Sequence, residues 1–174
     1  GSVAVWALLI GCSITCFYLY HSSGQEVLAP SYCQIEIPQG ASSKLLLPDS
    51  TIVFLNGGTV LKYDALLRHQ ADREVFLSGE AYFKVARNVR KPFIVHTEDM
   101  SVEALGTAFE LFSYNMENKM EAILLNGKIK VSVENKETNQ MKEYFVSPDE
   151  KILVDRQTGK ISKQIVDADK YTAW

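Results

Sequence analysis

The stretch Leu77-Ser78-Gly79-Glu80-Ala81-Tyr82-Phe83-Lys84-Val85 decides the fold of this chain. Ala81, Phe83 and Val85 lie two residues apart, so in an extended strand they share one face. This alternation indicates a sheet with one face buried and the other in water. Gly79 stands just before the alternating residues, where a glycine permits a turn or a close approach of another backbone segment.

The same period continues outward from this stretch. In the run 128–134, Ile129, Val131 and Val133 form a second apolar face. Short β-rich runs are separated by turn residues at short intervals. These turn signals are Pro38-Gln39-Gly40, Pro48-Asp49-Ser50, Asn56-Gly57-Gly58, Ser78-Gly79, Asn126-Gly127, Ser147-Pro148-Asp149 and Gln157-Thr158-Gly159. The pattern predicts an all-β domain and leaves a sandwich, a barrel and a solenoid-like stack open.

One turn predicts a specific hairpin. Asn126-Gly127 lies between Ala122–Leu125 and Lys128–Val133, and Asn-Gly suits the two positive φ angles of a type I′ turn. We therefore expect these two strands to pair.

A second hairpin is expected around Asp155–Gly159, where it would join Lys151–Val154 to Lys160–Val166. The helix candidate of the folded part is Tyr63–Ala71, which is too short to be stable on its own.

The beginning of the chain has a different composition. Val3 to Tyr20 contains 18 residues without a charge, and the first charged residue is Glu26. As a helix this segment would be about 27 Å long, close to the roughly 30 Å of a bilayer's hydrocarbon core. Trp6 near one end and Tyr18 near the other resemble interfacial aromatic residues. We therefore expect a transmembrane helix.

Two alternatives to a span remain open. A cleaved signal peptide is disfavoured because the later part of the segment is bulky and aromatic. A lipoprotein anchor at Cys12 fits the lipobox-like run Leu9-Ile10-Gly11-Cys12, although apolar rather than polar residues follow that cysteine. The other thiols, Cys16 and Cys33, complete an odd set, so unpaired cysteines are expected, with an intermolecular bridge through Cys33 as the alternative.

Sites for chemistry are sparse. His21, His69 and His96 are far apart in sequence, and neither a metal-binding spacing, a nucleophile elbow nor a phosphate loop is present. The net charge of −3, without a basic patch in the sequence, gives no support for nucleic-acid binding. We expect a protein that is not an enzyme and uses no cofactor or metal.

Four runs, in this order and spacing, resemble the FecR family. They cover most of the region from Gln34 to Val154. The runs are Pro38-Gln39-Gly40 leading into Leu45–Asn56 (with Leu47-Pro48-Asp49-Ser50), Leu77–Val85, Lys91–Thr97, and Leu105-Gly106-Thr107-Ala108-Phe109-Glu110-Leu111. The chain departs from the family pattern at four positions. Ser50 and Asp149 replace glycines, Glu110 replaces a common Asn, and Asn126 replaces a frequent Glu.

The residues that carry the resemblance are interpreted as structural rather than catalytic. Phe83, Phe93 and Phe109 are expected in the core, and Gly79 and Gly106 at turns or close backbone contacts. The full set is Gly40, Asp49, Asn56, Gly79, Glu80, Phe83, Pro92, Phe93, Gly106, Thr107 and Phe109.

The resemblance implies a role in signalling. FecR-like proteins cross the inner membrane once, bind an extracytoplasmic-function sigma factor through a cytoplasmic N-terminal region, and receive a signal from a TonB-dependent outer-membrane transducer. The implied layout is a transmembrane helix and exit over residues 1–25, a periplasmic β domain over 26–166, and a linker over 167–174 toward a C-terminal domain. For such relatives the implied architecture is a twisted β-solenoid-like stack, with a jelly-roll-like sandwich as the alternative.

On this interpretation the sigma-binding region would lie upstream of Gly1, and the transducer would dock around or beyond Trp174. A glycan-binding module is the alternative function. It would need exposed aromatic side chains, for which Tyr82, Tyr114 and Tyr144 are the candidates.

Overall fold

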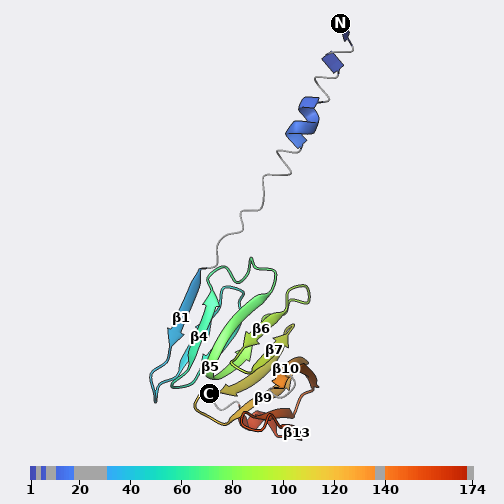
Figure 1. Cartoon of the computed structure of the whole chain (residues 1–174). Helices are drawn as coiled ribbons and strands as arrows, with labels where there is room; N and C mark the ends of the chain where they lie inside the picture. Colours follow the sequence, from blue (N-terminus) through green and yellow to red (C-terminus); the bar gives the residue numbers. More distant parts are fainter. Residues whose placement is uncertain (3–4, 7–10, 18–30, 136–139, 172–174) are drawn as a thin grey trace.

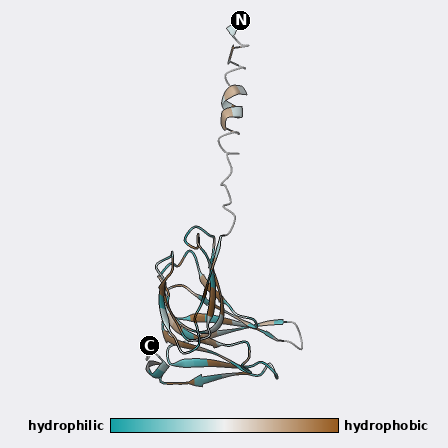
Figure 2. Cartoon of the chain, turned by 90° about the vertical axis from the view of Figure 1, so that its left-hand side faces the viewer, coloured by the Kyte–Doolittle hydropathy of each residue, from teal (hydrophilic) through white to brown (hydrophobic). Residues whose placement is uncertain are grey.

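The computed structural model describes residues 1–2, 5–6, 11–17, 31–135 and 140–171. Residues 11–17 are helical, and Figure 2 shows the hydrophobic character of this short stretch. The described residues from 31 onward form thirteen strands and one 3-10 helix. Figure 1 shows how they are arranged. The elements are β1 (Tyr32–Glu36), β2 (Ser43–Leu46), β3 (Ile52–Leu55), β4 (Val60–Asp64), β5 (Arg73–Lys84), β6 (Phe93–His96), β7 (Met100–Ala104), β8 (Ala108–Ser113), β9 (Lys119–Asn126), β10 (Ile129–Asn135), β11 (Gln140–Val146), β12 (Glu150–Asp155), β13 (Ile161–Ile165) and η1 (Ala168–Tyr171).

Strand β5 organises the sheet because it belongs to two halves of it. Its beginning pairs with β4 and, in parallel, with β6, whereas its end pairs with β3 and β8. The first half of the sheet therefore has the order β1-β4-β5-β6-β7-β10-β11. The second half has the order β2-β3-β5-β8-β9-β12-β13.

The two halves meet where β5 bends at Gly79. This glycine has a φ of +126°, and a Cβ there would lie 2.5 Å from Oγ1 of Thr59. Both facts require glycine, which confirms the close approach expected from the sequence. The bend makes the sheet curl, so that its inner faces enclose one core.

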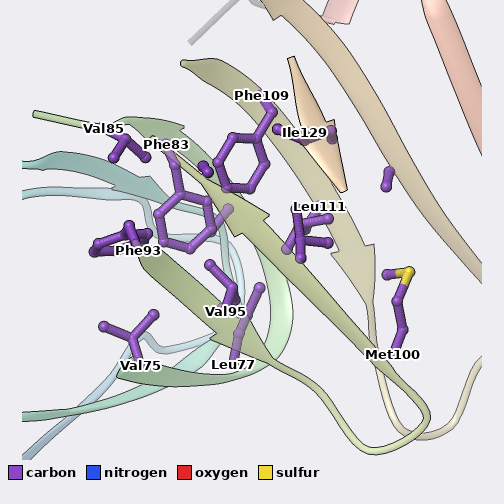
Figure 3. Packing of buried hydrophobic residues seen from close by; sticks show 14 of the residues in the cluster. Val75, Leu77, Phe83, Val85, Phe93, Val95, Met100, Phe109, Leu111 and Ile129 are labelled. Carbon is purple, nitrogen blue, oxygen red and sulfur yellow. The ribbon is translucent and has the colours of Figure 1, made fainter. Parts of the chain in front are cut away.

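Three phenylalanines join the two halves within that core (Figure 3). Phe83 on β5 stacks on Phe109 of β8 with ring centroids 5.2 Å apart, and it meets Phe93 of β6 at 5.9 Å. All three side chains are fully buried. The core positions predicted for these rings are confirmed, as are the buried faces of Ala81 and Val85 on the same side of the chain.

The predicted hairpin at Asn126-Gly127 is wrong. Strand β9 pairs with β8 and β12, while β10 pairs with β7 and β11, so the two strands belong to different halves of the sheet. Gly127 has a φ of +92°, but among the described non-glycine residues only Ser50 and Asp149 have positive φ. Asn126 therefore lacks the angle that a type I′ turn needs. The glycine serves a crossing between the halves and packs against Thr107.

The second hairpin is confirmed. Strands β12 and β13 pair with Val154 opposite Ile161, and Gly159 closes the turn with a φ of +64°.

The helix considered for Tyr63–Ala71 is not formed. Strand β4 runs to Asp64, and the chain then makes turns. The bonds Leu67 N to Asp64 O and His69 N to Leu66 O span only three residues. The Asp64 carboxylate accepts from the backbone N–H of Leu66 and from Gln70, and this favours a turn over a helix.

The described chain is mostly β, and its architecture is a curled mixed sheet resembling half of a barrel. Its pairs are antiparallel apart from β5–β6, so it is not a regular stack of coils. No helix within the described residues has the length and apolar character to cross a bilayer. The predicted span, Val3–Tyr20, lies partly outside the described residues, as do residues 172–174.

Candidate functional site

The residues around the bend of β5 form a closed hydrogen-bonding network. The side-chain amide of Asn56 donates to Oε2 of Glu80 at 2.7 Å. The Thr59 hydroxyl donates to the Glu80 carbonyl and accepts from the Glu80 N–H, both at 3.0 Å. Together with Gly79, these residues hold the strand at the point where it passes from one half of the sheet to the other. The motif residues Asn56, Gly79 and Glu80 therefore have a structural role here.

A buried ion pair fastens the two halves at the beginning of β5. Nη1 of Arg73 lies 2.8 Å from Oδ2 of Asp49, and both side chains are only 3% exposed. Nη1 also donates to the carbonyl of Ala86, and Nε donates to that of Lys91. One guanidinium thus connects the turn before β3, the beginning of β5 and the loop between β5 and β6.

The Pro48-Asp49-Ser50 signal predicts a turn at Asp49, whereas Arg73 is not among the residues predicted from the sequence. A signal for Arg73 is present, because by the period of two it falls on the same face as Val75 and Leu77. A charged residue at such an inward position needs a buried partner. Its partner lies 24 residues earlier in the chain, so the pair becomes visible only in the fold.

Glu110 on β8 is a second buried charge-bearing group, with 6% of its surface exposed. Burial, then the charge and hydrogen bond of Glu80, then the charge of Glu121 raise its pKa to about 8. At neutral pH its carboxyl is therefore mainly protonated, and it can donate a hydrogen bond to Glu80. Its Oε2 has no partner among the described residues. The two carboxyl groups share one face of the second half of the sheet, since Tyr82 is opposite Glu110 and Glu80 is opposite Phe112.

The remaining motif residues lie in turns and loops. Gly40 has a φ of +78°, and Gly106 has a φ of +144° with the Cα of Arg87 2.7 Å from where its Cβ would be. Thr107 is buried, and its carbonyl accepts from Val85 N. The carbonyl of Pro92 accepts from Arg73 N. The motif residues are therefore spread over the bend, the ion pair, the core and separate loops, and they do not converge on one pocket.

A hollow of about 340 Å³ lies on the outer face of the first half of the sheet. Phe76 and His96 stack there with ring centroids 5.2 Å apart, and Tyr32 meets Phe76 edge-on at 6.3 Å. Nζ of Lys62 lies 4.3 Å from the centroid of the Tyr32 ring. Nε2 of His96 is 3.5 Å from a carboxylate oxygen of Glu74. This face has exposed aromatic side chains, which are enriched at protein contact surfaces, beside charges of both signs.

The aromatic platform considered for glycan binding is not formed. Tyr82 is buried, the hydroxyl of Tyr114 donates to the carbonyl of Gly57 at 2.8 Å, and Tyr144 packs against the core. Within residues 31–135 and 140–171, as in the described N-terminal stretches, no group of three His, Cys, Asp or Glu residues could hold a metal ion.

Comparisons with known proteins show the family to which the chain belongs. Residues 34–130 match the family described as FecR protein, and the chain belongs to this family. A crystal structure of a candidate anti-sigma factor from Parabacteroides distasonis ATCC 8503 is 34% identical, with a TM-score of 0.77 over 83% of this chain. A second crystal structure with the same description is also 34% identical, with a TM-score of 0.76 over 82% of this chain. The chain spans 64% of the length of each of these structures. A search of curated proteins finds no match.

Proposed function

We propose that this chain is part of an anti-sigma factor-type transmembrane signal transducer and is not an enzyme. In this proposal it relays a signal from a TonB-dependent outer-membrane transducer to an extracytoplasmic-function sigma factor. The β domain lies in the periplasm, and the protein crosses the inner membrane once. The observation that carries the proposal is the FecR match over residues 34–130, together with 34% identity to a candidate anti-sigma factor.

The N-terminal segment supports membrane attachment. Residues 3–20 contain no charge, and their described apolar side chains Val5, Trp6 and Ile14 are exposed. Exposed apolar side chains at this density suit a lipid environment better than water. A lipid anchor at Cys12 would also attach the domain to a membrane. Palmitate labelling and cleavage before this residue would favour the lipoprotein over the span.

The edge of the second half of the sheet supports docking of a transducer. Strand β13 pairs only with β12 among the described strands, so its outer edge is open for an added strand. Ile165 at its end is 89% exposed. The following η1 packs back onto β9, which leaves this edge uncovered by the described residues.

A sigma-dependent reporter tests the signalling role. Deleting the gene should change transcription from promoters of the partner sigma factor, and a two-hybrid assay should detect binding between that sigma factor and the full-length protein. A reporter that is unaffected by deletion, together with no binding, would contradict the proposal.

Docking is tested by capturing the transducer's signalling domain with the full-length protein. Ile165→Asp should weaken capture, because it places a charge on the edge that accepts the added strand. Met116→Asp is the matched control, since Met116 is 95% exposed in a turn after β8. Equal capture by both variants would exclude this edge. If the full-length protein bound a polysaccharide tightly, and neither it nor the two variants captured the signalling domain, glycan binding would replace signalling as the proposed function.

A further inference from the structure

Basic side chains gather at one end of the domain. They lie in the loop 65–72 between β4 and β5 and in the loop 85–92 between β5 and β6. Arg68, Arg87 and Arg90 are exposed, and Lys91 is half-buried. Asp72 is the exposed acid in these two loops. We call the set Arg68, Arg87, Arg90 and Lys91 the basic end. It is strongly positive, although the chain as a whole has a net charge of −3.

The structure holds the two loops of the basic end together. Nζ of Lys91 donates to the carbonyl of Arg68 at 3.1 Å. A hollow of about 210 Å³ lies between the loops, lined by Asp49, Arg68, Arg73, Ala86, Arg87, Asn88 and Lys91. The one carboxylate in that lining, Asp49, is already paired with Arg73. The other cations of the lining therefore keep their positive charge available for an anion from outside.

The basic end is also where the N-terminal segment enters the domain. Ser31 donates its N–H to the Asp64 carboxylate at 3.2 Å, and its carbonyl accepts from Ala65 N at 2.8 Å. Ser31 is thus fixed beside the first residues of the loop 65–72. Figure 1 shows that β4 ends, and β5 and β6 begin, at this same end of the domain.

The apolar segment Val3–Tyr20 ends eleven residues before Ser31. Even a fully extended chain of that length spans at most about 40 Å. A segment held in a bilayer therefore keeps Ser31, and the basic end beside it, within about 40 Å of the membrane surface.

We propose that the basic end docks on anionic phospholipid headgroups of the bilayer to which the chain is attached. This inference rests on the proposed membrane attachment and adds an orientation to it. Arginines bind phosphate groups through paired N–H donors, and a patch of them is attracted to an anionic surface. Docking places the basic end against the lipid, and the edge of β13 stays open to a partner.

Nanodiscs containing the whole chain test this contact. Hydrogen exchange of the loops 65–72 and 85–92 is measured in discs of phosphatidylcholine alone and in discs with about 30% phosphatidylglycerol. Each basic residue near an anionic surface strengthens binding about fivefold. We expect exchange in both loops to slow at least about fivefold in the anionic discs. The effect should disappear at about 0.5 M NaCl, where charges are screened.

Two variants separate the basic end from other cations. The triple variant Arg68→Gln, Arg87→Gln, Arg90→Gln should lose the protection, while Lys160→Gln, Lys163→Gln in the β12–β13 hairpin should keep it. Urea unfolding checks that both variants fold. Equal exchange in the two kinds of disc would overturn the inference. So would equal protection of the loops by free inorganic phosphate in neutral discs, which would indicate a small-anion site instead.

Failure of the proposed membrane attachment can be distinguished from failure of lipid binding by the basic end. A chain that does not associate with neutral discs lacks the apolar anchor, yet it should still float with vesicles containing phosphatidylglycerol if the basic end binds lipid. Flotation lost in the triple variant supports the inference in that case, and absence of flotation contradicts it.

Discussion

Replacing Glu110 by Gln should make the domain more stable at alkaline pH and leave it nearly unchanged at acidic pH. Burial and the neighbouring carboxylate of Glu80 raise the pKa of Glu110 to about 8, from a model-peptide value near 4.5. The folded protein therefore keeps a proton that the unfolded chain has already released between these two values. Stability must fall as pH rises through this window.

The size of the effect follows from proton linkage. Each pH unit inside the window costs roughly 1.4 kcal/mol, and the full interval would approach 5 kcal/mol. Solvent screens the charges of the half-buried neighbours Glu80 and Glu121, which reduces this value, and we expect a loss of about 2 kcal/mol. Glutamine keeps the shape and an N–H donor for Glu80, and it cannot ionise.

Urea unfolding at several pH values between about 5 and 9 measures the difference in stability between variant and wild type. The difference should be near zero at the acidic end and reach about 2 kcal/mol in favour of the variant at the alkaline end. Glu103→Gln is a control on β7, outside the face that Glu110 shares with Glu80, and it should not reproduce the gain. A difference that stays constant with pH would refute the assignment of a protonated carboxyl to Glu110.

Three further predictions concern the fold. Arg73→Met should lower the free energy of unfolding in urea by about 3–5 kcal/mol, because it leaves the Asp49 carboxylate buried without its partner. A loss below about 1 kcal/mol would show that the ion pair does not join the halves of the sheet. Phe83→Ala should lower the free energy of unfolding by about 3–5 kcal/mol, whereas Lys84→Ala, on the exposed face of β5, should lower it by well under about 1 kcal/mol. Equal losses would contradict the assigned faces of the strand. Ser50→Gly should raise stability by up to about 1 kcal/mol, because Ser50 has a φ of +73°, an angle that glycine adopts without strain. Ser43→Gly in β2 should lower stability, and a loss at both positions would exclude relief of backbone strain at Ser50.

The departures from the FecR pattern become meaningful in the structure. Ser50 and Asp149 replace glycines, and both have positive φ, which explains why the family favours glycine there. Asp149 makes use of its side chain, because its Oδ1 accepts from Ala168 N at 3.3 Å. Glu110, in place of a common Asn, introduces a carboxyl that burial keeps protonated.

The sequence alone determined which side of β5 and of β10 faces the core. Ala81, Phe83 and Val85, and likewise Ile129 and its neighbours on β10, are buried as their period of two predicts. The pattern is reliable because successive side chains of a strand point to opposite faces, whatever strand lies alongside. The β12–β13 hairpin was predictable for a similar reason, since its turn and its pairing are local.

The tertiary structure decided which strands are neighbours. An apolar face shows that one side of a strand is buried, but it does not identify the element that packs against it or the strand beside it. The sequence Asn126-Gly127 is therefore compatible both with a hairpin and with a crossing between the halves of the sheet. The bend of β5 at Gly79 sends its two ends to different partners, and this in turn brings Arg73 to Asp49 and Glu80 to Glu110. These pairings depend on residues distant in the chain, and the pKa of Glu110 depends on burial that no local stretch of sequence specifies.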